Sequence, residues 1–397
     1  MLLLRAMSYE SPAKARPLRL AILGSRGIPA RYGGFETFAQ EIALRLSEQG
    51  VETTVFCEAL AGGRPVRYGK VRLEYARAPF GGPPARILYD LFCLWRARSR
   101  YDVVYMLGYG SAFLCWIPRL FGTKVWINMD GIEWQRSKWG GFARWWLKSM
   151  EGIACRVANR LIFDNGALGH SVAQRRRNLP PQSVLAYGAP VVATPPDVGR
   201  LRTMGLEPGR YLLTVGRFEP ENHLLEIVRA AAAREGGAPL IVVTSTAERT
   251  PWQREVLTHA GRLVRFVGPV YDQEVLRALR YHCLAYLHGH SVGGTNPTLL
   301  ESMGCGNLIL AHDNPFNREV LGEMGRFFAD EADLSDKLWD VERMGERQRR
   351  LIGDGARDRV INLYTWDHVA HGYLELLSAF AGSRSPKEPV LREASGS

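Results

Sequence analysis

The feature that most constrains the fold is a series of short apolar runs that alternate with helical patterns. The series begins with the run LRLAILG at residues 18–24 and a pattern at 35–49, where Phe38, Ile42 and Leu46 fall on one helical face. Further strands are predicted at 51–57, 71–76, 102–107, 124–129, 161–163 and 183–187. Apolar strands that alternate with helices are typical of a parallel sheet covered on both faces. We therefore predict an α/β domain.

A second series of the same kind starts at residues 211–216, with the apolar run YLLTVG. Its further predicted elements are strands at 240–244, 263–267, 283–287 and 308–311, and a final helix over 366–380. The stretch 188–209 between the two series is rich in Pro and Gly and has no period, which indicates an interdomain linker. A length of 397 residues also favours two domains. We expect two similar α/β halves with a cleft between them.

Several features of the composition favour a cytoplasmic protein. No apolar run reaches the roughly 18 residues that a membrane-spanning helix needs. The apolar start of MLLLRAMSYESPAKARP is too short for a signal peptide. The six cysteines are scattered and form no Cys-x-x-Cys pair, which indicates small core residues in a reducing compartment rather than disulfides or zinc ligands.

The charge is uneven along the chain. Residues 1–200 hold 28 Lys and Arg against 14 Asp and Glu, whereas residues 201–397 hold 23 against 26. The basic half also holds seven of the ten tryptophans, all between Trp95 and Trp146. Tryptophans beside cations, as in ARWWLKSM at 143–150, suit a surface that meets anionic lipid headgroups. We expect the first half to contact an anionic membrane surface; the alternative is an Arg-rich surface over a Trp-rich core.

The loop GSRGIPARYGGFETF follows the first strand, where ligands bind in open parallel sheets. Gly33 and Gly34 stand immediately before the helix, so a side chain at either position could block a ligand from the first-turn N–H groups. Those N–H groups and the helix dipole favour an anion or a hydroxyl-rich ligand, and Arg26 and Arg31 add positive charge. The alternative is a tight turn whose glycines serve positive φ.

The segment VGRFEPEN (215–222) begins at the end of the first strand of the second series. Arg217 would point into the cleft from this strand end, where its planar fork could hold two oxygens of a diphosphate. The alternative is a surface ion pair with Glu219 or Glu221.

The most specific segment is HGHSVGGTNPTLLESMGCG (288–306). It passes from a strand through two glycines to a helix, for which Asn296 is a suitable N-cap and Pro297 a suitable first-turn residue. Glu301 lies one turn inside the helix, too far for a capping box, where it could accept bonds from ribose hydroxyls. A metal at His288 and His290 is not expected, because no acidic cluster completes a site; His290 is instead expected to bond phosphate or sugar.

Together these segments, with DGIEWQRSKW (130–139) and YTWDHVAHGYLELL (364–377), resemble the retaining glycosyltransferases of family 4. More narrowly, they resemble the bacterial rhamnosyltransferase-like subgroup, over residues 18–377. The resemblance implies the GT-B fold, in which two Rossmann-like parallel-sheet domains face a cleft and the C-terminal helix crosses back to the first domain. It also implies sugar transfer from a nucleotide diphosphate donor with no essential metal and no cofactor.

The resemblance divides the chain into six parts. These are a flexible N-terminus (1–17), an acceptor-side N-terminal domain (18–192), a linker (193–209), a nucleotide-sugar-binding domain (210–365), a crossover helix (366–380) and a disordered tail (381–397).

The resemblance also implies roles for particular residues. Arg217 binds the donor diphosphate, Glu301 binds the nucleotide ribose, and the backbone from Thr295 through Asn296 to Thr298 caps the phosphates. Gly33 and Gly34 approach the donor from the facing domain. Asp130 follows the strand KVWINM, where many relatives carry a histidine, and is the first candidate to contact the donor sugar or acceptor; its alternative role is to cap the following loop.

This chain departs from the family pattern at two positions. Asn222 stands where many members have a lysine, and Gly293 stands where the usual Glu-x7-Glu pair has its first acid. The diphosphate is then expected to depend more on Arg217, the helix dipole and His290. The subgroup shares the Gly-Gly-Thr-Asn-Pro pattern, so the departures do not imply loss of activity.

The expected reaction leaves negative charge on the departing diphosphate, which Arg217 and the helix end would stabilise. By resemblance the donor is dTDP-L-rhamnose, with UDP-glucose, another UDP-hexose or GDP-mannose as alternatives. A polyprenyl-diphosphate-linked saccharide is the expected acceptor, at the inner face of the cytoplasmic membrane. The product would belong to a capsule, exopolysaccharide or other cell-surface polymer.

Two other function classes fit the sequence less well. An NAD-dependent oxidoreductase or epimerase remains the alternative of another class, although the Gly-x-Gly-x-x-Gly turn that it needs is missing. A nucleic-acid-binding protein is suggested by the net charge of +11 but would need basic and aromatic residues interleaved on a recognised module. We expect no nucleic-acid partner.

Overall fold

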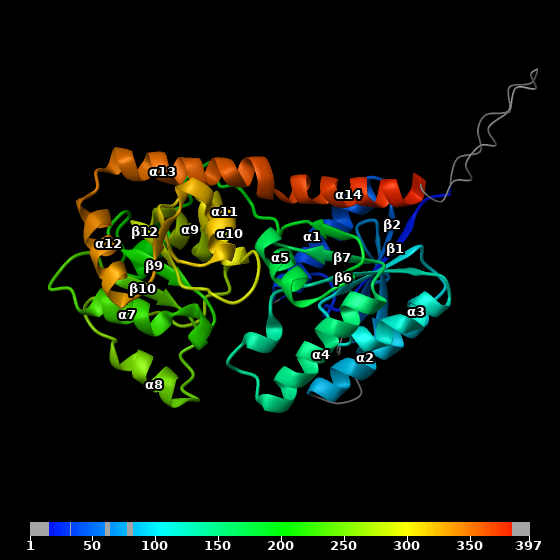
Figure 1. Cartoon of the computed structure of the whole chain (residues 1–397). Coiled ribbons are helices and arrows are strands. Elements are labelled where there is room, and N and C mark those ends of the chain that lie inside the picture. Colours follow the sequence, from blue (N-terminus) through cyan, green and yellow to red (C-terminus); the bar gives the residue numbers. More distant parts are fainter. Residues whose placement is uncertain (1–15, 32, 60–63, 78–81, 383–397) are drawn as a thin grey trace, which may run out of the picture.

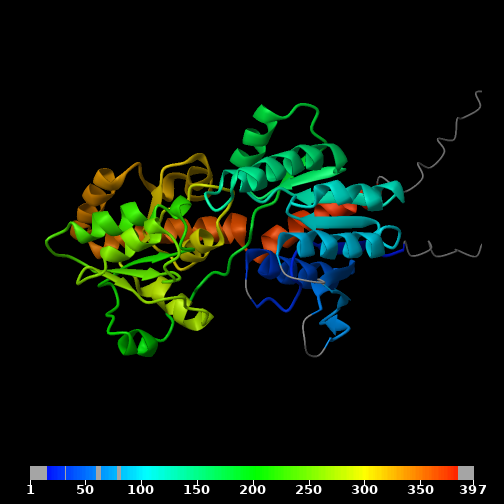
Figure 2. The same cartoon turned by 90° about the horizontal axis from the view of Figure 1, so that it is seen from below.

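The computed structural model describes residues 16–31, 33–59, 64–77 and 82–382, and these form two α/β domains that lie side by side (Figure 1). The view from below shows the same arrangement (Figure 2). Most of the expected flexible N-terminus (1–17) and tail (381–397) lies outside the described residues.

The first domain is built on an eight-stranded sheet of order β3-β4-β2-β1-β5-β6-β7-β8. Every neighbouring pair is parallel except β3 and β4. The strands are β1 (Arg19–Leu23), β2 (Glu52–Glu58), β3 (Arg67–Tyr68), β4 (Val71–Ala76), β5 (Val103–Leu107), β6 (Lys124–Asn128), β7 (Arg160–Phe163) and β8 (Gln182–Val184). All but β3 were predicted; two residues are too short to give an apolar period.

The second domain has a six-stranded, fully parallel sheet of order β11-β10-β9-β12-β13-β14. Its strands are β9 (Leu212–Val215), β10 (Leu240–Val243), β11 (Val264–Phe266), β12 (Ala285–His288), β13 (Ile309–His312) and β14 (Arg326–Phe328). The edge strand β14 was not predicted, because only its last residue is buried.

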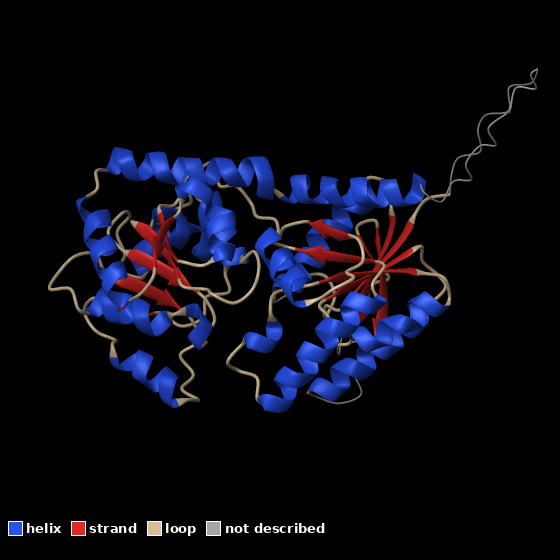
Figure 3. Ribbon diagram, in the orientation of Figure 1, coloured by secondary structure: helices blue, strands red, loops and turns tan. Residues whose placement is uncertain are grey.

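Helices cover both faces of each sheet (Figure 3). In the first domain they are α1 (Gly34–Glu48), α2 (Pro83–Ala97), α3 (Trp116–Leu120), α4 (Gly141–Val157) and α5 (Gly166–Arg175). In the second they are α6 (Gly199–Thr203), α7 (Leu224–Ala232), α8 (Pro251–Thr258), α9 (Gln273–His282), α10 (Pro297–Gly304), α11 (Pro315–Leu321), α12 (Glu331–Arg343) and α13 (Glu346–Arg359). No helix of the described residues is both long and apolar enough to span a bilayer.

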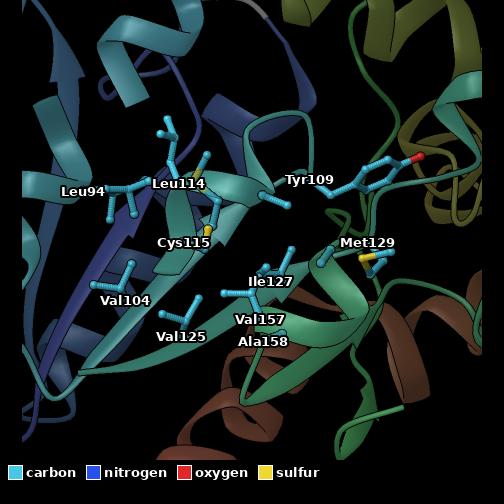
Figure 4. Close-up of a cluster of buried hydrophobic side chains, with 14 of the residues drawn as sticks. Leu94, Val104, Tyr109, Leu114, Cys115, Val125, Ile127, Met129, Val157 and Ala158 are labelled. Atoms are coloured by element: carbon cyan, nitrogen blue, oxygen red, sulfur yellow. The ribbon is translucent and has the colours of Figure 1, made fainter. Parts of the chain in front are cut away.

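Apolar side chains from strands and helices form the core of each domain. One cluster of the first domain packs Val104 of β5 and Ile127 of β6 against Leu94 of α2 (Figure 4). Burying each such side chain contributes about 1.5–3 kcal/mol. Five of the six cysteines are also buried, as expected of small core residues.

The last helix, α14 (Trp366–Gly382), crosses back and packs on the first domain beside α1. The Tyr373 and Tyr105 hydroxyls are 2.7 Å apart, and the Phe38 and Tyr373 rings are 5.7 Å apart. Trp366 packs in the same cluster. The predicted two-domain α/β architecture with a returning C-terminal helix is therefore confirmed.

The stretch expected to be a linker, 193–209, is only partly a connection. It contains helix α6, and Leu201 and Leu206 are buried in the core of the second domain. Two apolar residues in a Pro- and Gly-rich stretch gave no period, so their burial could not be predicted.

Candidate functional site

A cavity of about 1550 Å³ lies between the two domains and is lined by residues of both. It is lined by all nine residues that the sequence singled out: Gly33, Gly34, Asp130, Arg217, His290, Thr295, Asn296, Thr298 and Glu301. The carboxyl ends of the central strands of both sheets open toward it, since parallel strands place their following loops at one edge. The structure thus brings every candidate residue to one site.

Glycines stand at the amino-terminal ends of both α1 and α10. These two helix ends face each other across the domain boundary. A Cβ added at Gly34 would lie 3.8 Å from Pro297 Cγ, which is ordinary contact. Gly34 therefore marks where the first domain approaches α10, whereas the sequence predicted that it approaches the donor.

Gly33 has a different role from its neighbour. Its φ is +109°, which L side chains rarely adopt, and an added Cβ would clash with the Glu36 carboxylate. Glu36 Oε1 accepts a hydrogen bond of 2.8 Å from Arg26 N–H. The turn alternative therefore explains Gly33, and a carboxylate so near this helix end makes it less suited to an anion than to a hydroxyl-rich ligand.

The amino terminus of α10 is capped as predicted. Asn296 is the N-cap, and its side chain accepts bonds from Thr298 N–H (2.9 Å) and Thr298 Oγ (2.8 Å). Pro297 occupies the first turn and has no N–H to donate.

The backbone donors of this turn are largely engaged within the protein, which revises the expected phosphate cap. Thr295 N–H donates to Asp164 Oδ2 at 3.1 Å, and Thr295 Oγ1 donates to the Asp164 carbonyl at 2.5 Å. Thr298 N–H is held by Asn296. Thr295 therefore connects the two domains, and what this helix end offers an anion is chiefly its dipole.

Arg217 lies exposed after β9 and lines the cavity. It forms no ion pair with Glu219, Glu221 or any other residue that the structure describes. The surface ion pair considered as an alternative is therefore not present. A guanidinium held at a cavity without a carboxylate partner is available to an anionic ligand.

Asn222 ties the Arg217 loop to His290. Its Nδ2 donates to the Arg217 carbonyl at 2.6 Å, and its Oδ1 lies 2.8 Å from His290 Nδ1. With Oδ1 as the acceptor, His290 Nδ1 carries the proton and Nε2 is left as an acceptor. Burial and the charges of His288, Arg136 and Arg217 lower the pKa of His290 far below its ordinary value. A neutral ring with a free acceptor nitrogen suits a sugar hydroxyl better than a phosphate.

Glu301 is held in place by a buried arginine. Its Oε2 lies 2.5 Å from Arg280 Nη2, and the Arg280 side chain is 5% exposed. No hydrogen bond or ion pair of Glu301 Oε1 is found among the residues that the structure describes. One oxygen is thus fixed and the other is available at the cavity wall, an arrangement that differs from an ordinary solvated helix glutamate.

Two carboxyl groups from the first domain lie at the domain boundary. Asp130, after β6, is half-buried, and burial together with the charge of Glu133 raises its pKa. Asp164, after β7, is buried, and burial and Asp130 raise its pKa well above the ordinary value. A Cβ added at Gly294 would overlap Asp164 Oδ1. No cap of the following loop by Asp130 is found among the described contacts.

The sequence reasoning missed Asp164 and Arg136. Asp164 directly follows β7, and that position in LIFDNG was the available signal. Arg136 lies within the quoted segment DGIEWQRSKW but received no role; it lines the cavity and is 6% exposed. In the described part of the chain no group of three or more His, Cys, Asp or Glu residues is placed to hold a metal.

Comparisons with known sequences divide the chain as the fold does. Residues 18–190 match a family model described as a domain of unknown function, DUF1972, and residues 217–375 match one described as glycosyl transferase-like. No curated protein matches in sequence.

Many solved structures have a similar fold. Sucrose-phosphate synthase from Thermosynechococcus elongatus aligns with a TM-score of 0.77 and 16% identity, covering 92% of this chain and 100% of that one. Anabaena HepE in complex with UDP-glucose aligns at 0.70 and 14%, covering 91% and 100%. The Escherichia coli trehalose-6-phosphate structure bound with UDP-2-fluoro glucose aligns at 0.69 and 12%, covering 90% and 98%. The two domains thus have the GT-B fold, and the second is a glycosyl transferase-like domain.

Proposed function

We propose that this glycosyltransferase of the GT-B fold is a retaining enzyme that transfers a hexosyl group from a nucleoside diphosphate sugar to a lipid-linked saccharide. The observation on which this rests is the meeting of Arg217, the α10 amino terminus and Glu301 in one interdomain cavity. Metal independence and the absence of a cofactor are part of the proposal.

The proposed transfer reaction depends on the charged groups that the second domain places at the cavity. Breaking the bond from the anomeric carbon to the diphosphate leaves negative charge on the leaving oxygen. Arg217 and the positive end of the α10 dipole would stabilise that charge. Glu301, oriented by Arg280, would accept bonds from the nucleotide ribose.

Groups from both domains would act on the sugars. His290 Nε2 can accept a bond from a sugar hydroxyl, and Asp130 is placed at the cavity to contact the donor sugar or acceptor. Retention would follow from attack on the same face as the leaving diphosphate, which itself takes the acceptor proton.

We propose dTDP-L-rhamnose as the first donor to test, from the subgroup resemblance. UDP-glucose or another UDP-hexose is the next, because Anabaena HepE, which has a similar fold, was solved in complex with UDP and with UDP-glucose. GDP-mannose is the third.

Apolar residues in the cavity lining support a lipid-linked acceptor such as a polyprenyl-diphosphate-linked saccharide. The amino-terminal halves of α2 and α4 contribute Ala85, Ile87, Phe142, Ala143, Trp146 and Leu147 to this lining. A hydrocarbon chain would gain about 0.8 kcal/mol for each CH₂ group buried there. The polymer would be a capsule or exopolysaccharide.

The outer surface of α2, α3 and α4 supports binding to the cytoplasmic membrane face. It exposes Phe92, Trp95, Trp116, Leu120, Phe121, Phe142 and Trp145. Cations lie among them: Arg98 stands 4.2 Å from the Trp95 ring centroid and Arg119 stands 5.2 Å from that of Trp116. Aromatic side chains with adjacent cations suit an anionic bilayer surface.

Thermal-shift screening with dTDP-, UDP- and GDP-sugars tests the proposed donor class. We expect one sugar nucleotide to raise the melting temperature of the wild type and of Arg347→Ala, an exposed control on α13, but not of Arg217→Ala. No response of the wild type to any donor would contradict the proposal.

Co-sedimentation with anionic vesicles tests the proposed membrane surface. The double variant Trp95→Ser with Phe121→Ser should sediment with the vesicles less than the wild type does; unchanged sedimentation would rule out this surface.

A further inference from the structure

Arg136 is a buried cation at the cavity whose hydrogen-bonding groups are mostly without partners. It lies just after the short 3-10 helix Glu133–Gln135 of the first domain and lines the cavity, and its side chain is 8% exposed. Its Nε lies 2.6 Å from Glu133 Oε1, and no other ion pair or side-chain hydrogen bond of Arg136 is found among the described residues. Of the Arg136 nitrogens, Nε is fully buried without a well-aligned hydrogen bond, which is costly, and the two Nη groups have no partner among the described residues.

The loop that carries Arg136 is fixed against the second domain. Tyr109 Oη accepts a bond from Glu133 N–H at 3.0 Å, which holds the loop from the first-domain side. A Cβ added at Gly131 would lie 3.1 Å from Gly293 Cα and 4.0 Å from Arg136 Nη2. A Cβ at Gly293 would lie 3.5 Å from His290 Nε2. Arg136 therefore stands where the first domain meets the His290 loop of the second.

Arg136 and Arg217 act on the same groups from opposite domains. Both guanidinium charges lower the pKa of His290, and both oppose the increase in the pKa of Asp130 that burial and Glu133 cause. Glu221 also faces this region, bonded to Ser137 Oγ at 2.6 Å. Glu133 is the carboxylate that pairs with Arg136.

We infer that Arg136 supplies, from the first domain, a second guanidinium for the donor diphosphate held by Arg217. This inference rests on the proposed function and deepens it. The amino-terminal end of α10 offers few free donors to a diphosphate. Thr295 N–H and Thr298 N–H already donate to protein groups, and Pro297 has no N–H. A diphosphate carries more charge than Arg217 and one helix dipole neutralise, and a planar fork suits its paired oxygens.

The arrangement has a consequence for the catalytic cycle. Because one guanidinium belongs to each domain, the diphosphate is bound tightly only while the domains are together. Opening of the cavity would remove one of its two cations and favour release of the nucleoside diphosphate product.

The test measures what the second phosphate adds to nucleotide binding. Calorimetry gives Kd for UDP against UMP, and for dTDP against dTMP, with the wild type, Arg136→Gln, Arg136→Lys and Glu133→Gln. We expect the wild type to bind the diphosphate more tightly than the monophosphate, and we call the ratio of the two Kd values the β-phosphate gain. In Arg136→Gln this ratio should be about 10- to 100-fold smaller, as expected for loss of a charge-assisted bond. Monophosphate affinity should stay within about twofold, and Arg136→Lys should retain part of the gain.

The matched control separates diphosphate binding from loop positioning. Glu133→Gln breaks the same ion pair but leaves the guanidinium, so it should keep the β-phosphate gain. The double variant Glu133→Gln with Arg136→Gln leaves no buried unpaired charge and should lose the gain while its melting temperature stays near that of the wild type. A full gain in Arg136→Gln or the double variant, or an equal loss in Glu133→Gln, would overturn the inference. Equal binding of mono- and diphosphates by the wild type would instead refute the proposed function.

Discussion

The amino-terminal ends of α1 and α10 have the same sequence signature, glycines directly before a helix, but serve different purposes. At α1, Gly33 has a φ of +109° and the Glu36 carboxylate lies over the helix end. At α10, Gly294 is so close to Asp164 of the other domain that a side chain has no room. The comparison teaches that a glycine before a helix can serve backbone conformation or close approach of another domain, and the surroundings decide which.

The largest expected effect tests the proposal that the donor diphosphate binds at the amino-terminal end of α10 rather than at that of α1. Arg217→Ala should lower the turnover number by on the order of 10²- to 10³-fold, because a donor aimed at developing negative charge is removed. Single-turnover transfer from the active donor measures it. Arg26→Ala, on the α1 side of the cavity, is the matched control and should have a much smaller effect. Equal losses would remove the distinction between the two ends.

The second prediction tests close approach. Gly294→Ala should lower turnover by about 10²-fold, because the added methyl pushes the domains apart and misplaces the reacting groups. Gly34→Ala, whose methyl would make ordinary contacts with Pro297 and Tyr187, should stay near the wild type. Kinetics with purified variants of matched melting temperature would check this, and a fully active Gly294→Ala would contradict it.

The third prediction tests the backbone role of Gly33. Gly33→Ala should lower the free energy of unfolding by about 1–3 kcal/mol, since an L residue is forced into a backbone conformation with positive φ that essentially only glycine adopts. Donor affinity should change little, because we propose that the diphosphate binds at the other helix end. Urea denaturation measures the free energy of unfolding, and donor titration measures the donor affinity. A Gly33→Ala variant with unchanged stability but without donor binding would show that Gly33 serves the ligand and not the backbone conformation.

The smallest expected effect is a change of stability with pH, caused by His288, which lines the cavity from the second domain. Burial lowers the pKa of His288 to about 3, so the folded protein keeps it neutral while the unfolded chain is protonated below about pH 6.5. The unfolded state then binds more protons, and the free energy of unfolding falls as the pH drops from 6.5 toward 3. Between pH 7 and 5.5 this histidine should account for about 1 kcal/mol, which His288→Gln should remove from the difference between urea denaturations at the two pH values. An unchanged difference would show that His288 is not held neutral.

Much of the site could be predicted because it depends on local sequence. Asn296 and Pro297 are favoured at a helix start whatever surrounds them, and the structure places them there. The roles of Thr295 and Asn222 could not be predicted in this way. Thr295 donates to Asp164, which is 131 residues away, and Asn222 bonds His290, which is 68 residues away.

The apolar pattern by itself determined two α/β halves, the positions of their main strands along the chain and the loops in which the candidate residues lie, because period and capping are properties of neighbouring residues. Tertiary structure alone decided that Thr295 ties the domains together, that Glu301 is oriented by Arg280, and that Arg136 is buried at the cavity beside Gly131 and Gly293. The physical reason is that burial and charge pairing depend on which segments meet in space, and segments far apart in sequence meet only when both sheets are formed and packed together.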